Sequence, residues 1–438
     1  GAYPRLYRPC VRCNMGWTMD GLISMPAAAP PPFTPAGTRI VLMEGVSATA
    51  VGLFQAAGYT DITRHSKAME GAALVEAVRG AYVLGIRSRT QLTEEVLAAA
   101  GPLMAVGCFC IGTDQVDLHA ARSLGIPVLN APFSNTRSVA ELTVGEIVML
   151  LRRILPRSEG AHRGGWDKSA TGSYEVRGKT LGIVGYGNIG SQLGTLAEAM
   201  GMRVVYFDRT DKLRTGNTAV LGSLADLLAV SDVVSLHVPD TPATQGMIGA
   251  AEIAAMKPGT CLINNSRGSV VDLDALAAGL RSGHLAGAAI DVFPHEPKSA
   301  AEAFSSPLQG LPNVILTPHI GGSTEEAQER IGEEVARKLL DFLGTGSTGG
   351  AVNFPRIEQP RLAGQSRYLH VHRNVPGVLG RLNAVFSARN LNVSAQSLQT
   401  DGELGYVMID AEGPPSACGE VLGALCAIDG TIRARVLS

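Results

Sequence analysis

The chain has 438 residues, of which 45% are hydrophobic, and a formal net charge of −2, as expected for a globular protein of several domains. This balance excludes the strongly basic surface of a nucleic-acid or membrane-surface binder, and no apolar run reaches the roughly 18 residues that span a bilayer. Seven scattered cysteines favour reduced thiols and a cytoplasmic protein over a disulfide framework.

The first 37 residues differ in composition from the rest of the chain. Residues 26–35 are rich in Pro and Ala, and the segment has little to bury, so we expect residues 1–37 to be a disordered extension. Organellar targeting is an alternative, because the segment holds three arginines and a single acidic residue, although it is not serine-rich as a transit peptide is.

Short apolar runs then alternate with helical patterns, which predicts parallel sheets covered by helices. The first series has strands at 39–43, 82–86 and 104–106, and one long helix is predicted over 139–155. A second series begins at Thr180. Its predicted strands are 181–184, 203–207, 233–236, 260–263, 288–292 and 314–316, enough for a doubly wound sheet.

The last 70 or so residues predict a separate small unit. A strand at 368–372 and a helix at 376–389 precede strands at 393–398 and 406–409, which are joined across Asp401-Gly402. A further helix and a strand at 432–436 complete a βαββαβ pattern.

A glycine fingerprint indicates a dinucleotide site. Gly185, Gly187 and Gly190 form a Gly-x-Gly-x-x-Gly between a predicted strand and a predicted helix, where backbone can approach a pyrophosphate. Asp208 ends the next predicted strand, and its carboxylate favours NAD over NADP by binding ribose hydroxyls. The neighbouring Arg209 leaves NADP as an alternative.

Three polar residues at predicted strand ends suit the oxidation of a 2-hydroxy acid. Arg267 can hold a carboxylate bidentately, His319 can exchange a proton near neutral pH, and Glu296 can orient that histidine. Taken singly, each is also compatible with an ordinary surface role. Their occurrence together after the glycine fingerprint favours catalysis.

These motifs together resemble the D-isomer-specific 2-hydroxyacid dehydrogenase family, from about Arg39 to Pro355. The similarity rests on the fingerprint, on the block from residue 264 to residue 297, and on Thr-Pro-His-Ile-Gly-Gly at 317–322. It implies a doubly wound Rossmann domain over 135–321 and a split flavodoxin-like substrate domain over 38–134 and 322–360. The fold class is thus α/β, with a C-terminal α+β ACT regulatory domain over 365–438.

The resemblance also implies residue roles. Arg267 binds the substrate carboxylate and carbonyl, Glu296 supports His319, and His319 is the proton donor or acceptor. The residues implied to contact NAD are Gly185, Gly187, Asn188, Ile189, Gly190, Asp208, Asn265, Ser266, Arg267, Asp291, His319, Gly321 and Gly322. The family usually has Ala or another small residue where this chain has Asn265. No metal ligands are implied.

Further positions match the family's substrate end. Arg87, Arg89 and Asn135 match substrate-binding positions, and Lys168 is expected to reach the site of a neighbouring subunit. Arginines at i and i+2 of an extended segment share one face, which would suit a phosphate, although two solvated surface arginines are the alternative.

The tail is similar to ACT domains that sense serine. His372, Asn374 and Asn392 match the effector-binding positions, although a dimerisation module that binds nothing is the alternative. The family often has a glycine pair as a hinge before this domain, where this chain has only Gly364.

The expected function is oxidation of 3-phospho-D-glycerate to 3-phosphohydroxypyruvate with NAD. This reaction is the first step of L-serine biosynthesis, and feedback inhibition by L-serine and a homotetramer joined through Rossmann and ACT interfaces are also implied. Reduction of another 2-oxo acid such as 2-oxoglutarate is one alternative. A non-catalytic NAD-responsive binding protein is another, although Arg87, Arg89 and a serine-type ACT tail argue against it.

Overall fold

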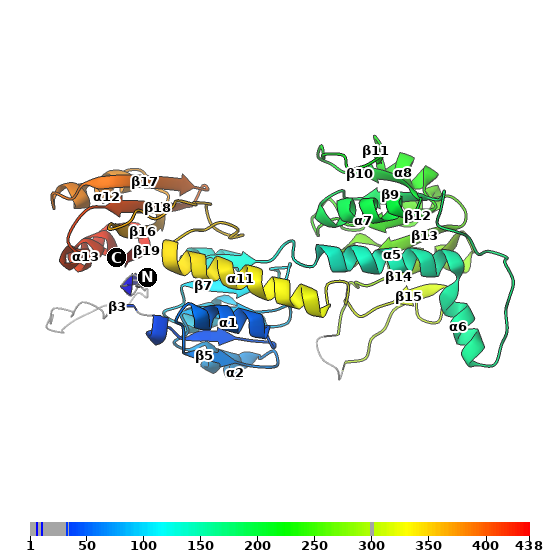
Figure 1. The fold of residues 1–438 in the computed structure, drawn as a ribbon, viewed down its shortest axis with the longest axis horizontal. Helices are drawn as coiled ribbons and strands as arrows, with labels where there is room; N and C mark the ends of the chain where they lie inside the picture. Colours follow the sequence, from blue (N-terminus) through cyan, green and yellow to red (C-terminus); the bar gives the residue numbers. More distant parts are fainter. Residues whose placement is uncertain (1–5, 8–9, 12–31, 34, 298–301) are drawn as a thin grey trace. The chain divides into compact units, whose positions relative to one another are not determined.

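The structure is a computed structural model that divides into two compact units. Unit 1 comprises Gly1–Pro132 and Gln328–Ser438, and unit 2 comprises Phe133–Ala327. The described residues are 6–7, 10–11, 32–33, 35–297 and 302–438 (Figure 1). Within these ranges, none of the helices has the length and apolar character needed to cross a membrane.

Unit 2 contains a parallel sheet of seven strands in the order β11-β10-β9-β12-β13-β14-β15. Strand order reverses around β9, which confirms the predicted Rossmann arrangement. In such sheets, ligands bind at the carboxyl ends of the strands. The strands are β9 (Thr180–Val184), β10 (Arg203–Phe207), β11 (Ala219–Val220), β12 (Val233–Leu236), β13 (Thr260–Asn264), β14 (Leu285–Ile290) and β15 (Val314–Leu316).

Helices cover both faces of this sheet. On one face α5 and α7 bury Ile147 and Leu193, and on the other α8, α9 and α10 bury Leu227, Ile253 and Leu276. Because both faces are covered, a strand can be buried along its whole length, as β12 is. The helices are α5 (Thr136–Arg152), α6 (Ile154–His162), α7 (Asn188–Ala199), α8 (Leu224–Val230), α9 (Ala250–Ala255), the 3₁₀ turn η2 (Gly268–Val270) and α10 (Leu273–Arg281).

The single long helix predicted over 139–155 is wrong. The chain breaks at Arg153, which adopts a left-handed conformation with φ of 52° between α5 and α6. Pro156 explains the break, because it has no N–H to donate to the Arg152 carbonyl and would clash with it in a continuous helix. Pro156 is tolerated in the first turn of α6, where no such bond is required.

Unit 1 contains a second parallel sheet, with strand order β5-β4-β6-β7-β8. This is the predicted flavodoxin-like order, in which the second strand of the chain lies at one edge. Its elements are β4 (Ile40–Leu42), α1 (Ala48–Ala56), β5 (Ile62–Arg64), α2 (Gly71–Val78), β6 (Val83–Ile86), α3 (Glu94–Ala99), β7 (Ala105–Cys108), α4 (Leu118–Ser123) and β8 (Val128–Asn130), with η1 (Pro35–Gly37) before them. Helix α11 (Glu325–Thr345) begins at the end of unit 2 and continues into unit 1.

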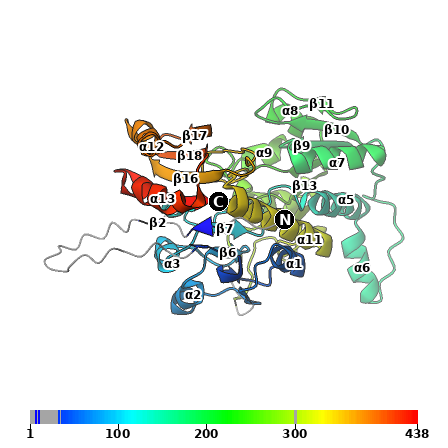
Figure 2. The same ribbon diagram turned by 60° about the vertical axis from the view of Figure 1, so that its left-hand side comes forward.

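The C-terminal part of unit 1 has the predicted βαββαβ order. Its antiparallel strands lie in the order β17-β18-β16-β19, with α12 and α13 beside them (Figure 2). Val378, Leu382 and Leu425 of these helices pack against one face of the sheet. The elements are β16 (Ser366–Arg373), α12 (Val378–Ser387), β17 (Val393–Thr400), β18 (Leu404–Ala411), η3 (Pro415–Ala417), α13 (Cys418–Ala427) and β19 (Thr431–Leu437).

Short strands of the N-terminal extension extend this sheet. β1 (Leu6–Tyr7) and β2 (Cys10–Val11) pair with β19, and β3 (Pro32–Phe33) pairs with β1. These segments differ from the expected disordered extension. Without these segments, β19 would be an edge strand with unpaired backbone groups, which an extended segment of almost any composition can satisfy. The rest of residues 1–34 lies outside the described residues.

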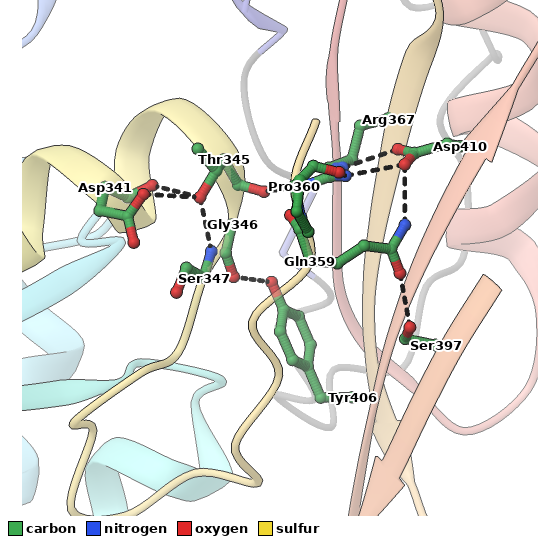
Figure 3. A network of polar contacts seen from close by, with 10 residues as sticks. All are labelled: Asp341, Thr345, Gly346, Ser347, Gln359, Pro360, Arg367, Ser397, Tyr406 and Asp410. Carbon is green, nitrogen blue, oxygen red and sulfur yellow. Dashed lines mark hydrogen bonds and ion pairs between the residues drawn. The ribbon is translucent and has the colours of Figure 1, made fainter. Parts of the chain in front are cut away.

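The other face of the antiparallel sheet packs against α11 and the substrate part of unit 1. Leu369 and Tyr406 share one apolar core with Leu339. At the edge of this core, the buried Arg367 forms a two-point ion pair with Asp410, at 2.6 and 2.7 Å (Figure 3). Asp410 also accepts a hydrogen bond from Gln359 Nε2 at 2.8 Å, which joins the sheet to the linker that precedes it.

Candidate active site and effector site

The turn from β9 to α7 is shaped for close approach of backbone and ligand. Gly185 has φ of +92°, and a Cβ there would lie 2.5 Å from the His237 carbonyl oxygen. A Cβ on Gly190 would lie 2.3 Å from the Gly185 oxygen, so helix and turn require glycine at both positions. At Gly187 nothing lies within 4 Å of such a Cβ, which leaves the space that a pyrophosphate needs beside the first turn of α7.

Asp208 lies beside this turn at the end of β10. Its Oδ2 accepts a hydrogen bond from the Tyr186 amide at 2.9 Å, and its Oδ1 accepts from the amide and hydroxyl of Thr210 at 3.0 Å. The carboxylate is thereby held against the glycine turn. This placement fits a group that receives ribose hydroxyls, and with the open glycine turn it fits a dinucleotide.

His319 and Glu296 form a hydrogen-bonded pair. The distance from His319 Nδ1 to Glu296 Oε2 is 2.9 Å, and the other carboxylate oxygen accepts the Phe293 amide at 3.2 Å. The hydrogen bond to Glu296 raises the pKa of His319 in spite of its partial burial. Burial acts to raise the pKa of Glu296, but its hydrogen bond with His319 and the Phe293 amide lower it. With Nδ1 engaged, Nε2 is the atom that can exchange a proton with a ligand.

Asp291 organises the turn that carries this histidine. Its Oδ1 accepts from the Thr317 hydroxyl at 2.7 Å and the Ile320 amide at 2.8 Å, and its Oδ2 accepts from the Gly321 amide at 2.8 Å. Its backbone oxygen accepts the amide of His319, which has a φ of 55°. The sequence analysis predicted Asp291 only as an NAD contact and did not predict its hydrogen bonds to the turn that carries His319.

Arg267 lies in a tight turn at the end of β13. Asn264 accepts the amide and hydroxyl of Ser266 through Oδ1 and donates through Nδ2 to the Arg267 oxygen at 3.0 Å. A Cβ on Gly268 would lie 2.1 Å from the backbone of Phe293, so the turn lies directly against the segment that leads to Glu296. The positive charge of Arg267 acts to lower the pKa of both Glu296 and His319, which places the three side chains in one electrostatic environment. Sequence reasoning missed Asn264.

Asn135 reaches the same region from the N-terminus of α5. Its Nδ2 would lie 2.2 Å from a Cβ on Gly322, so the carboxamide lies against the turn that carries His319. Its Oδ1 is buried and has no hydrogen-bond partner among the described residues. Unit 2 therefore brings together Arg267, Glu296, His319 and Asn135.

Arg87 and Arg89 belong to unit 1, directly after β6. The segment is a bend rather than the extended stretch that was predicted, so the argument for one shared face does not apply. The bend wraps around the Glu44 carboxylate, which accepts the amides of Arg87, Arg89 and Thr90 at 2.8 to 3.2 Å. Lys168 is exposed in the segment that follows α6.

His372 lies at the end of β16 in a buried position. Its Nδ1 is 3.3 Å from His370 Nδ1, and burial lowers the pKa of His372 to about 4. Asn374 follows the strand and donates through Nδ2 to the Gly402 oxygen at 3.1 Å. These two residues are therefore neighbours at one end of the sheet.

Asn392 lies at the opposite end of the same sheet. The last residue of β16 pairs with Leu404, at the start of β18, whereas the first residue of β17 pairs with Ala411, at its end. The eight residues of β18 separate Asn374 from Asn392 by about 25 Å along the strands. One chain therefore does not bring all three predicted effector residues together.

Comparisons with known proteins agree with this arrangement. A family model described as D-isomer specific 2-hydroxyacid dehydrogenase, NAD binding domain, matches residues 144–321, and one described as AHAS small subunit-like ACT domain matches residues 369–433. The D-3-phosphoglycerate dehydrogenases of Escherichia coli (strain K12) and Haemophilus influenzae are each 55% identical over 399 residues, covering 91% of this chain and 97% of each relative. The structure of D-lactate dehydrogenase from Aquifex aeolicus, complexed with NAD and lactic acid, is 30% identical with a TM-score of 0.64, covering 72% of this chain and 100% of that chain.

Proposed function

Because the chain belongs to the D-3-phosphoglycerate dehydrogenase family, within the D-isomer-specific 2-hydroxyacid dehydrogenases, we propose that it oxidises 3-phospho-D-glycerate to 3-phosphohydroxypyruvate with NAD. The reaction is the first step of L-serine biosynthesis. The observation that carries the proposal is the hydrogen-bonded pair of His319 and Glu296 beside Arg267, at the carboxyl edge of a Rossmann sheet.

Each of these residues has a part in alcohol oxidation. Arg267 holds the substrate carboxylate with its planar guanidinium, and His319 Nε2 takes the proton from the hydroxyl group. Glu296 fixes the orientation of the imidazole and stabilises the imidazolium that forms. Bound NAD supplies the hydride acceptor.

The cofactor is held by the turn between β9 and α7 and by neighbouring strand ends. Asn188 and Ile189 open α7 and offer backbone amides to the pyrophosphate, and Asp208 receives the ribose hydroxyls. The segment Asn265–Arg267 and the turn that ends in Gly321 and Gly322 complete the cofactor contacts.

The substrate phosphate is assigned to Arg87 and Arg89. Both follow a parallel strand at its carboxyl end, and Glu44 holds the backbone of their bend. Asn135 completes the substrate end, and Lys168 acts in the site of a neighbouring subunit. The division into a Rossmann domain over 135–321, a substrate domain over 38–134 and 322–360, and an ACT domain over 365–438 is part of the same proposal.

L-Serine is the proposed inhibitor, bound by His372 and Asn374 together with Asn392 of a second copy. The separation of Asn374 and Asn392 within one chain supports a site shared between two ACT domains. A homotetramer joined through Rossmann and ACT interfaces provides that pairing. A cytoplasmic location fits the free thiols of Cys108, Cys110, Cys261, Cys418 and Cys426.

The test is NADH formation from NAD and 3-phospho-D-glycerate, measured by absorbance with and without L-serine. Activity that serine suppresses is the expected result. NADH consumption with 2-oxoglutarate and no activity with 3-phospho-D-glycerate would support the proposed hydride transfer but contradict the proposed substrate. Absence of turnover with either would contradict the proposed enzyme.

A further inference from the structure

A buried carboxyl group that the proposed reaction does not use lies behind the Arg267 turn. Glu146 is on the inner face of α5 and has no exposed surface (0%). Its Oε2 accepts a hydrogen bond from Asn265 Nδ2 at 2.7 Å, and its Oε1 has no hydrogen-bond partner within the described ranges. A buried acid with a single uncharged donor is costly, so the arrangement calls for an explanation.

Asn265 is held by two bonds to α5. Besides Glu146, its Nδ2 donates to Thr143 Oγ1 at 3.0 Å. Thr143 gives its own hydroxyl proton to the Val139 oxygen at 2.8 Å, so towards Asn265 it can only accept. Both N–H groups of the amide are thereby engaged, and the side chain is only 7% exposed.

This contact reaches the proposed chemistry through two peptide units. Asn265 is the first residue after β13, and Arg267 follows two residues later. Asn264 ties the turn together from within, whereas Asn265 ties it to a different element, α5. A small residue at position 265, as the family usually has, would leave no such connection.

We propose that Glu146 is a positioning residue for Arg267: through its hydrogen bond to Asn265 it holds the Asn265–Arg267 turn against α5. The inference rests on the proposed function, because it takes Arg267 as the group that binds the substrate carboxylate. It adds a role for two residues, Glu146 and the unusual Asn265, that act on the reaction without touching substrate.

The strength of this connection depends on pH. Burial raises the pKa of Glu146 to about 7, with the hydrogen bond from Asn265 opposing the shift and the charge of Asp291 adding to it. Asp291, at the end of β14, is the charged group that acts on Glu146. Asn265, which follows β13 and donates to Glu146, is uncharged, and so is Thr143 of α5, which accepts from Asn265. Ionised Glu146 forms the stronger, charge-assisted bond, so the connection tightens as pH rises through about 7.

The experiment compares Glu146→Leu, Glu146→Gln and Asn265→Ala with the wild-type enzyme. Ser231→Ala is the matched control, because its hydroxyl is equally buried and bonds the Leu227 oxygen at 2.6 Å, away from the Arg267 turn. The first readout is hydrogen exchange of the peptide 264–270, which requires no substrate. The second is kcat/KM for 3-phospho-D-glycerate as a function of pH.

Faster exchange in 264–270 is expected for Glu146→Leu and Asn265→Ala, together with a loss of about tenfold in kcat/KM. Ser231→Ala should change neither. Glu146→Gln keeps the acceptor without the charge, so it should stay within about twofold of wild type below pH 6. His319 titrates in both enzymes, so its effect cancels when the kcat/KM of the wild type is divided by that of Glu146→Gln. The ratio therefore reports the ionisation of Glu146, and it should rise as pH passes about 7.

Three results would overturn the proposal. They are unchanged exchange in 264–270, a kinetic loss no larger than that of Ser231→Ala, and a ratio that stays flat across neutral pH. An enzyme inactive on 3-phospho-D-glycerate would instead contradict the proposed function, and the exchange comparison would still decide whether Glu146 holds the turn.

Thermal stability gives a third, independent check. The folded-state pKa of Glu146 is raised from 4.5 to about 7, so its stabilising contribution is complete below about pH 4.5 and is lost as pH rises through 7. Glu146→Gln lacks this loss. The Tm of Glu146→Gln minus the Tm of the wild type should therefore increase between about pH 5 and pH 8. A difference in Tm that stays constant over this range would contradict the burial of an ionisable Glu146.

Discussion

At the residue scale, the turn around His319 shows how one buried carboxylate supports a strained backbone. A φ of 55° is uncommon for a residue other than glycine, and such conformations persist only where the surroundings fix them. Asp291 supplies this support through two amides and one hydroxyl of the same turn. The histidine is thus oriented by Asp291 through its backbone and by Glu296 through its ring.

Replacing Glu296 with Gln should change the pH dependence of oxidation. His319 must be unprotonated to accept the hydroxyl proton, so kcat/KM rises with pH through the pKa of His319. Glu296 raises that pKa, so Glu296→Gln should move the rise to lower pH. Loss of orientation should also lower kcat by about 100-fold or more.

Steady-state rates across pH measure both effects. His295→Ala is the matched control, because His295 is the exposed neighbour of Glu296. A pH profile of Glu296→Gln that coincides with that of wild type would remove Glu296 from its assigned role.

Replacing Arg87 with Ala should act on substrate binding. A charge-assisted hydrogen bond contributes about 1.5–3 kcal/mol, so the KM for 3-phospho-D-glycerate should rise by about 10- to 150-fold, with little change in the KM for NAD. Arg79→Ala is the control, since Arg79 lies on the surface of the same unit and pairs with Glu76. An unchanged KM in Arg87→Ala would leave the phosphate without its assigned partner.

At the element scale, Arg367 joins three segments of unit 1. Besides Asp410, its guanidinium donates to the backbone oxygens of Thr345 at the end of α11 and of Gln359 and Pro360 in the linker, at 2.7 to 3.0 Å (Figure 3). All five N–H donors of the guanidinium can be satisfied in this arrangement. This cation stabilises the junction because the Asp410 side chain is only 1% exposed and cannot be hydrated if the guanidinium is removed.

Arg367→Met should therefore destabilise the antiparallel domain strongly. It leaves Asp410 buried without its cation, a loss of about 3–5 kcal/mol. Thermal unfolding should show a lower Tm for the transition of this domain. Arg356→Met is the control, because Arg356 pairs with Glu358 on the surface, where an ion pair contributes little. Equal Tm values for the two variants would contradict the role of the Arg367 junction.

The elements themselves were largely predictable from local patterns. The structure confirmed the βαββαβ order, the hairpin at Asp401-Gly402 and the strands of the Rossmann sheet. These elements were predictable because burial of one face of a helix or strand requires apolar residues at a regular spacing, which can be seen in the sequence. The short strands β5, β8 and β11 and the break at Arg153 were missed. A strand that short carries no period, and the break depends on where Pro156 falls within a turn.

At the scale of the whole molecule, the separation of Asn374 and Asn392 predicts how serine sites assemble. Asn374→Ala and Asn392→Ala should each weaken serine inhibition with catalysis intact. In a mixed dimer of ACT domains, one chain carries Asn374→Ala and the other carries Asn392→Ala. One shared site then contains both substitutions, whereas the other contains a native Asn374 and a native Asn392. Co-expression of the two variants should therefore restore part of the serine sensitivity.

Serine titration of the mixed enzyme measures this restoration. Either variant expressed alone is the control, because every shared site in it carries one substitution. If the mixture is as insensitive as the single variants, the effector site does not combine these two residues from different chains.

The sequence by itself determined the features that depend on short spacing. The glycine fingerprint, the apolar periods of strands and helices, and the placement of Arg267, Glu296 and His319 after strands are all local, and parallel strands necessarily gather their carboxyl ends at one edge. Only the tertiary structure decided which long-range partners these residues have. The contacts of Asp291 with the His319 turn, of Glu146 with Asn265, and of Arg367 with the linker join positions far apart in the chain. No local pattern encodes such pairs, because a buried side chain is satisfied by whichever complementary group the packing of distant elements brings to it.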